Sequence, residues 1–200
     1  HNLKLTVYGE SHGKSIGAVL DGLPSGEYLD WDEVKKEMAR RAPGKNTLST
    51  SRKEGDAFDV QSGYFNDATT GTPLAVMIEN TNTRSEDYDD LRHLMRPGHA
   101  DYTGKVRYDG YNDYRGGGHF SGRLTAPLVF AGAVAMQILG RRGIHVGSHI
   151  LQIHDVQDRP FNPVHEELSR LLSLKNMTLP LLDETRIEAM EQAVAASKSR

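Results

Sequence analysis

The sequence has 200 residues, 37% of them hydrophobic, and a formal net charge of −3 at pH 7. A chain of this length buries about 70% of its unfolded surface, enough for a real core in one domain or two small ones; we take residues 1–200 as a single domain. The near-neutral charge argues against a general nucleic-acid coat or a polybasic membrane binder. The lack of cysteine excludes thiol catalysis, disulfides and Cys-ligated metals, and fits a cytoplasmic location.

The predicted elements mix strands with helices. Alternating apolar residues at the start predict a half-buried strand, and Asp30 with Glu33 resembles the capping box of a helix that ends before Pro43. In chain order, we expect strands at 3–8, 16–20, 58–65, 73–79 and 144–156, and helices at 31–42, 125–139, 163–174 and around 187–194.

The helix at 125–139 is apolar on every side. At 15 residues it is too short to span a membrane, and no run of 18 apolar residues exists, so we expect a buried core helix and no membrane partner. The first residues show no apolar core of a signal peptide.

Basic residues gather in two islands of an otherwise mildly acidic chain. The first island, which contains no acid, comprises Arg40, Arg41, Lys45, Arg52 and Lys53, and the second lies within 92–123. Two arginines at a helix end also suit the helix dipole, but that does not explain the whole run. Since guanidinium forks bind carboxylates and phosphates bidentately, the islands predict a focused anion site.

Three loops carry glycine, histidine or arginine in patterns that suit catalysis or anion binding. The loop at 9–13 presents His12 at a strand end, where a general acid or base can act, although a Ser-His pair often only caps a turn. The loop at 96–102 offers Arg96 and His99 on a chain stiffened by proline, and a plain solvated loop is the alternative. No histidine spacing supports a zinc site, so no metal is expected.

The segment 111–123 is the most informative. Its three consecutive glycines let backbone N–H groups curl around an anion just before a helix N-terminus, where phosphate is favoured. Arginines and aromatic residues also occur in RNA-binding tails, but such tails repeat, whereas this segment occurs once and leads into a core helix. The combined loops predict a small, multiply charged ligand and a second, planar one that bears phosphate.

Together these segments resemble the chorismate synthase family. The first signature of the family is similar to residues 9–13 and their continuation to 21–24. The second signature is similar to residues 118–125, with Val129 and Gly132. Between them, segments 40–41, 70–73, 78–81, 85–88, 96–101 and 114–118 appear in family order. The likeness is strong over 3–156 and loose beyond.

The resemblance implies an activity. Chorismate synthase is a phosphate lyase of the shikimate pathway of aromatic amino acid biosynthesis. It converts 5-enolpyruvylshikimate-3-phosphate to chorismate by anti-1,4-elimination and depends on reduced FMN; NADPH serves as reductant in bifunctional relatives. The resemblance also implies an α/β (α+β) sandwich, with helices packed between antiparallel sheets, and a homotetramer in the cytoplasm.

The resemblance assigns roles residue by residue. His12 and His99 match the catalytic histidines, which protonate the leaving phosphate and serve the reduced flavin. Arg41, Arg96 and Arg123 match substrate-binding arginines, with Arg40, Lys45 and Arg52 as further substrate-binding candidates. Ser121, Gly122, Arg123 and His99 are the cofactor-binding candidates.

The sequence departs from the family in three respects. Thr47 stands where many members carry arginine, and His119 where some do. The family is also about twice as long, and its second half supplies further flavin contacts and the aspartate that helps remove the C6 proton. We therefore expect these 200 residues alone to be inactive; the alternative function is a fragment that binds phosphate-bearing ligands or flavin without turnover.

Overall fold

The computed structural model describes residues 2–42, 56–81 and 94–198. These residues form two compact units, the first ending at Ile138 and the second starting at Leu139. Each unit is described by itself, and the expectation of one domain over 1–200 stays a prediction.

The first unit is built on a four-stranded antiparallel sheet with strand order β1-β2-β6-β3. The strands are β1 (Lys4–Gly9), β2 (Ser15–Asp21), β3 (Phe58–Ser62) and β6 (Leu74–Glu79). A two-stranded hairpin, β4 (Tyr64–Phe65) with β5 (Ala68–Thr69), follows β3. The expected strand at 58–65 is divided because its register shifts between Val60 and Ser62 and Gly63 takes a positive φ of 85°.

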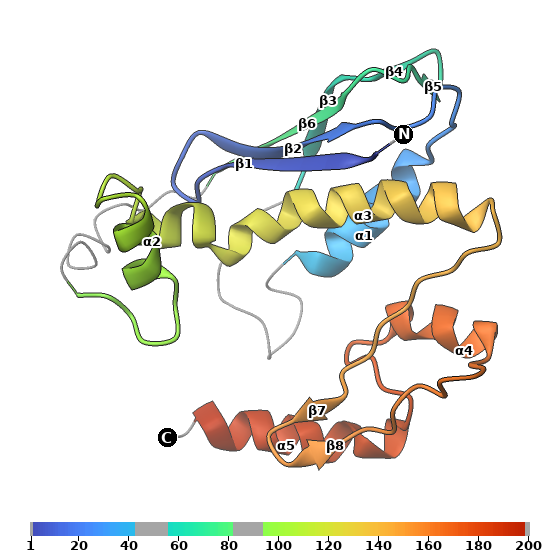
Figure 1. Cartoon of the computed structure of the whole chain (residues 1–200). Helices are drawn as coiled ribbons and strands as arrows, with labels where there is room; N and C mark the ends of the chain where they lie inside the picture. Colours follow the sequence, from blue (N-terminus) through green and yellow to red (C-terminus); the bar gives the residue numbers. More distant parts are fainter. Residues whose placement is uncertain (1, 43–55, 82–93, 199–200) are drawn as a thin grey trace. The chain divides into compact units, whose positions relative to one another are not determined.

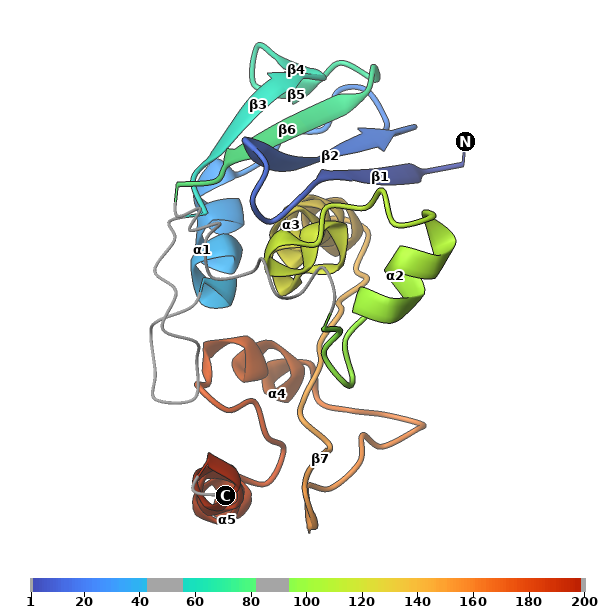
Figure 2. The same ribbon diagram turned by 90° about the vertical axis from the view of Figure 1, so that its left-hand side faces the viewer.

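Alternation along the central strands determines which face of the sheet is buried. Ile16, Ala18 and Leu20 of β2 pair directly with Ile78, Val76 and Leu74 of β6, and all six side chains are buried. Helices α1 (Trp31–Arg41) and α3 (Thr125–Gly140) contribute the opposing layer of this core and lie on the same side of the sheet (Figures 1 and 2). The antiparallel strands and packed helices confirm the α+β class.

The start of α1 is stabilised in two ways. The Asp30 side chain accepts hydrogen bonds from the backbone N–H groups of Asp32 and Glu33, which confirms the predicted N-terminus. The backbone of Asp30 also bonds in both directions with the Gln137 amide of α3, at 2.8 and 2.9 Å. The cap is therefore tied to the core helix as well as to its own first turn.

Helix α3 is buried as predicted: Phe130 and Val134 are fully inaccessible, and its inner surface is lined with small alanines. Two short 3-10 turns, Arg115–Phe120 and Gly122–Leu124, run directly into it. Within the described ranges, the combined segment Arg115–Gly140 is long and apolar enough to cross a membrane, judged by length and composition only. Half of its most apolar stretch is buried inside the structure, as in the core helix of a folded domain. Helix α3 itself has 16 residues against the 15 expected, and the added length comes from the two 3-10 turns.

The second unit contains α4 (Leu168–Ser173), α5 (Ile187–Lys198), the hairpin β7 (Gln152–Ile153) with β8 (Val156–Gln157), and 3-10 turns at Leu174–Asn176 and Glu184–Arg186. Its core comprises Leu179, Leu181 and Met190. The buried Asp158 carboxylate accepts from the backbone N–H groups of Leu182 and Asp183. Burial acts to raise the pKa of Asp158, but these N–H donors, together with hydrogen bonds from the His149 ring and the Arg159 backbone, lower that pKa.

Two predicted elements in the second unit were too long. The strand expected at 144–156 is limited to the two short strands of the hairpin, because no described strand pairs with 144–151. The helix expected at 163–174 begins only at Leu168. The Asn162 side chain accepts from the N–H groups of Val164 and His165 and holds that stretch in a turn.

Replacing Phe130 with alanine tests the core of the first unit. Phe130 is fully buried and contacts the rings of Trp31 and Phe58. Phe130→Ala is expected to lower the free energy of unfolding by about 3–5 kcal/mol through the cavity it leaves. Trp31 is the one tryptophan of the sequence, so its fluorescence during denaturant unfolding reports this unit. Leu128→Ala, on the same helix but 47% exposed, is the control and should cost far less.

Candidate functional site

The predicted functional loops meet at one end of the first unit. The turn after β1, the 3-10 turns before α3 and helix α2 (Asp101–Arg107) gather there (Figures 1 and 2). Two hydrogen bonds join the first two: the Ser11 backbone N–H donates to the Gly118 carbonyl at 3.0 Å, and the His119 side chain donates through Nδ1 to the Gly9 carbonyl at 2.8 Å. Segments about 110 positions apart in the sequence therefore form one surface.

The three consecutive glycines are required by their backbone conformation. Gly116, Gly117 and Gly118 have φ values of 57°, 87° and 55°, in the left-handed region that other residues rarely adopt. A Cβ on Gly118 would also overlap the Asp113 carbonyl. This segment therefore crosses the site as bare backbone.

His12 packs against the first of these glycines. Its side chain is 8% exposed, and the neighbouring Ser11 is fully buried. A Cβ on Gly116 would lie 2.5 Å from His12 Nδ1 and 3.1 Å from the Ser11 hydroxyl. The imidazole thus lies directly against the backbone of the glycine segment.

His99 occupies the same position against the second glycine. A Cβ on Gly117 would lie 2.8 Å from His99 Cε1 and 2.9 Å from Nε2. The ring is held by Asp101, whose Oδ1 is 2.6 Å from His99 Nδ1. Asp101 also accepts from Arg96 Nε at 2.8 Å and from Nη2 at 2.9 Å. These bonds hold the pKa of Asp101 far below its ordinary value, so its carboxylate is ionised.

Two of the predicted arginines share one buried carboxylate. Arg41 Nε donates to Asp56 Oδ2 at 2.8 Å, and Arg123 Nη1 donates to Asp56 Oδ1. The side chains of Asp56 and Arg123 are 1% and 3% exposed, and that of Arg41 is 17% exposed. The two guanidinium groups are therefore held side by side, with Asp56 neutralising one of their two charges.

Asn80 connects this charged group to the His12 turn. Its amide nitrogen donates to the carbonyls of Glu10 and Gly13, at 3.0 and 2.9 Å, and its Oδ1 accepts from Arg123 Nε at 3.1 Å. The position of the His12 turn is thus coupled to that of Arg123.

Comparison with known proteins identifies the family of this chain. A model of the family described as chorismate synthase matches residues 3–200. The chain belongs to the chorismate synthase family. Chorismate synthases from Thermococcus kodakarensis and Pyrococcus abyssi are each 43% identical over 196 residues, 98% of this chain and 53% of theirs. The one from Sulfurimonas denitrificans is 41% identical over 98% of this chain and 52% of its own.

A solved structure supports the same family assignment. A crystal structure of chorismate synthase superimposes with a TM-score of 0.69 at 26% identity, covering all of this chain and 55% of that one. The chain corresponds to the N-terminal half of its relatives and spans about half the length of the curated relatives that it matches. The resemblance seen in the sequence is thereby confirmed for the family and its fold.

The structure brings most of the chorismate synthase motif residues together. His12 and His99 lie against adjacent glycines, and Arg96 shares Asp101 with His99. Arg41 and Arg123 meet at Asp56. Arg40 belongs to neither group: it pairs with Glu37 one turn earlier on α1, and its side chain is 49% exposed. Lys45, Thr47 and Arg52 lie outside the described residues.

Ser121 and Gly122, the remaining cofactor candidates, differ in surroundings. The Ser121 hydroxyl accepts from the Arg123 N–H at 3.2 Å and caps the turn before α3. Gly122 is exposed, and a Cβ built there would meet nothing within 4 Å. Gly122 therefore leaves open surface, whereas Ser121 has a local structural role whether or not it also contacts a ligand.

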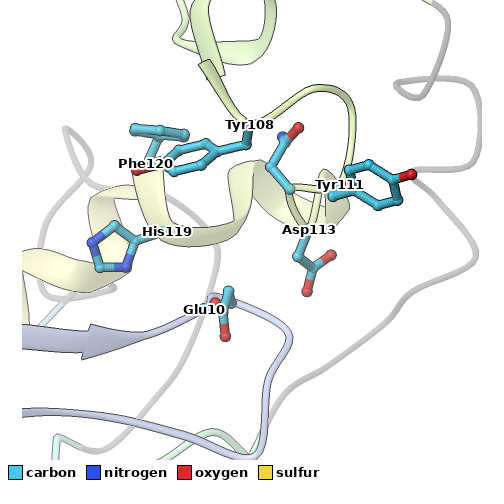
Figure 3. A pocket seen from close by; sticks show the side chains of 7 residues that line it. Glu10, Tyr108, Tyr111, Asp113, His119 and Phe120 are labelled. Carbon is cyan, nitrogen blue, oxygen red and sulfur yellow. The ribbon is translucent and has the colours of Figure 1, made fainter. Parts of the chain in front are cut away.

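A pocket of about 410 Å³ adjoins the glycine segment. Figure 3 shows its side chains, which are Glu10, Tyr108, Tyr111, Asn112, Asp113, His119 and Phe120. Asp113 accepts from Arg115 Nε and Nη2, which lower the pKa of Asp113. Aromatic walls suit a planar ring, but the two carboxylates, with no arginine or lysine among the described lining residues, disfavour a phosphate group. The predicted anion-binding role therefore stays with the arginines.

The sequence did not reveal Asp56 or the role of Asn80. Asp56 stood at the edge of the first basic island with no motif around it, and Asn80 was noted only as part of a family segment. The one available signal was charge balance: buried arginines require a carboxylate partner. Without the fold, nothing indicated which carboxylate supplies it.

Adding a methyl group to Gly117 tests the close packing of the glycine segment. Gly117→Ala forces a non-glycine residue to a φ of 87° and pushes against the His99 ring. We expect a loss of more than about 1 kcal/mol in the free energy of unfolding, measured by Trp31 fluorescence in denaturant. Gly122→Ala, where space is open, is the matched control and should change it by less than about 0.5 kcal/mol. Equal effects of the two substitutions would contradict the packing described here.

Removing the Asp56 carboxylate tests the shared ion pair. Asp56→Ala leaves the buried guanidinium of Arg123 without that carboxylate, and breaking a buried pair typically costs about 3–5 kcal/mol. The measurement is denaturant unfolding at neutral pH. Asp32→Ala, which breaks an exposed pair with Lys35 on α1, is the control and should have a much smaller effect. A comparable loss in both variants would show that Asp56 is not specially buried or paired.

Proposed function

We propose that the chain provides the N-terminal part of a chorismate synthase, a lyase that eliminates phosphate from 5-enolpyruvylshikimate-3-phosphate to form chorismate. The observation that supports this most is the placement of His12 and His99 against successive glycines of one segment. Two imidazoles presented by a rigid, side-chain-free backbone suit proton transfer at two points of one ligand assembly.

His12 is proposed to protonate the leaving phosphate. In a 1,4-elimination the C–O bond to phosphate breaks while a proton is lost from C6, so the departing oxygen gains negative charge. A buried imidazole held at a strand end can deliver a proton to that oxygen. The Gly116 backbone, against which the ring packs, limits how far the ring can move on that side.

The arginines are proposed to provide the field that attracts the substrate. The substrate carries two carboxylates and a phosphate. Arg41, Arg96 and Arg123 carry three positive charges against the two negative charges of Asp56 and Asp101, an excess of one before any protonated histidine is counted. Because Arg123 is buried, its effect reaches a ligand through space, whereas Arg96 is 38% exposed and can contact one.

The donor set at His99 and Arg96 fits an anionic flavin ring. Arg96 is 38% and His99 26% exposed, so both side chains can be reached from solvent; the guanidinium offers N–H donors, and the imidazole presents its Nε2 edge beside it. We propose that these two residues, with the open surface at Gly122, hold the reduced FMN. When bound, reduced FMN supplies an electron transiently with no net redox change. The protein's part is to orient the ring and stabilise its negative charge.

A second candidate function is ligand binding without turnover. The observation that favours it is that the chain spans about half the length of its relatives. The further half would then supply the rest of the flavin site and the base, and these 200 residues would bind flavin or phosphate-bearing ligands only.

Turnover by the 200-residue chain separates the two functions. The chain is incubated without oxygen with 5-enolpyruvylshikimate-3-phosphate and chemically reduced FMN, and chorismate is followed by absorbance. If chorismate forms, His12→Ala and His99→Ala should each lower the rate by about 10²–10⁴-fold, as loss of a general acid does. The control is His165→Ala, an exposed histidine of the second unit.

Each other result has a defined meaning. Saturable binding of reduced FMN and substrate by calorimetry, with no chorismate, would establish the binding function. Unchanged rates in both histidine variants would refute their assigned roles. No binding of either ligand would refute both functions for this chain.

A further inference from the structure

Asp101 is the first residue of α2, but its side chain bonds to Arg96 and His99 and not to the helix. This side chain is 9% exposed. Its two oxygens accept from the Arg96 backbone N–H at 3.0 Å, from two nitrogens of the Arg96 guanidinium, and lie 2.6 Å from His99 Nδ1. None of these bonds is to the first turn of its own helix. The carboxylate instead faces back toward the loop at 96–99.

We infer that Asp101 is a positioning residue that keeps a proton on His99 Nδ1, so that Nε2 is the nitrogen through which His99 acts. The argument begins with distance. Two hydrogen-bond acceptors repel each other at 2.6 Å, so a hydrogen must lie between Oδ1 and Nδ1. Because Arg96 keeps the carboxylate ionised, the hydrogen belongs to the ring nitrogen.

The charged neighbours of the ring agree with this assignment. Arg96 Nη2 lies 3.3 Å from Nδ1 and 3.5 Å from Nε2, and a guanidinium can only donate. Arg96 Nη2 is thus near both ring nitrogens and can donate to whichever one is unprotonated, so this contact is compatible with either tautomer. The Asp101 contact distinguishes them: an Nε2–H tautomer would set two acceptors, Oδ1 and Nδ1, against each other at 2.6 Å.

The glycine segment limits the ring from the other side. His99 Nε2 and Cε1 lie closest to Gly117, where even a methyl group would not fit. Gly117 carries no titratable group, so Asp101 and Arg96 are the charged residues of the described chain shown in contact with the ring. Asp101 is thus coupled to the His99 tautomer by direct contact and to its orientation through Arg96.

The tautomer of His99 is inferred from the Asp101 contact alone, whereas its meaning for catalysis rests on the proposed function. If His99 serves the flavin, Asp101 determines which nitrogen meets it and keeps the imidazole from turning away. This parallels the general rule that the tautomer of a functional histidine is set by the hydrogen bond of its other nitrogen.

Histidine NMR of the 200-residue chain tests the inference directly. The chain is labelled with ¹⁵N in its histidine rings, and His99→Gln identifies the His99 signals by their loss. Spectra are recorded at about pH 9, more than two units above the ordinary histidine pKa of about 6.5. The expected result is a protonated Nδ1 and an unprotonated Nε2 for His99. An Nε2–H tautomer in the unmodified chain would overturn the inference with no variant needed.

Variants provide the second arm. In Asp101→Ala the His99 Nδ1 signal should shift toward the unprotonated position, because the acceptor that held its proton is gone. Asp113→Ala is the matched control: Asp113 makes the same bidentate pair beside the same glycines, and the hydrogen bonds described for its carboxylate go to Arg115. Its removal should leave the His99 tautomer unchanged. An unchanged tautomer in Asp101→Ala, with folding verified by circular dichroism, would refute the inference.

These outcomes are separable from those of the proposed function. A chain that makes no chorismate but shows the Nδ1–H tautomer, lost in Asp101→Ala, would refute turnover and retain the role of Asp101. A chain that turns over substrate with an Nε2–H tautomer would do the reverse.

Discussion

The site depends on a stretch of backbone without side chains. Gly116, Gly117 and Gly118 all take positive φ, and this conformation lets two successive glycines lie at contact distance from two imidazoles. No other residue type allows both the backbone angles and the approach. Since the same segment leads into α3, the most buried helix of the first unit, the position of the histidines is tied to the hydrophobic core.

Charge pairing is the second constraint. The three arginines that match substrate-binding positions of the family are held by carboxylates of the chain itself, Arg96 by Asp101 and both Arg41 and Arg123 by Asp56. Burial of unpaired guanidinium groups would be costly, so these acids are a condition for having the arginines there at all. Among these five side chains, three arginines face two carboxylates.

The sequence predicted those local features that depend only on neighbouring residues. The Asp30 cap, the alternation along β2 and β6, and the continuous apolar run of α3 each depend on residues within a few positions. Predictions failed where a local signal lacked a tertiary partner: residues 144–151 have strand character but no described strand pairs with them, and Asn162 diverts the helix predicted from Pro163. The roles of His12 and His99 came from resemblance to the family, and their contact with one glycine segment came from the fold.

The sequence by itself determined the family, the glycine run, and the histidine and arginine candidates, because these are properties of residue types and their local order. Only the tertiary structure decided the partners. Asp56 lies 15 positions from Arg41 and 67 from Arg123, and Asn80 lies 43 from Arg123. A hydrogen bond or ion pair depends on distance in space, and over such separations the sequence carries no measure of that distance until sheet register and helix packing have determined it.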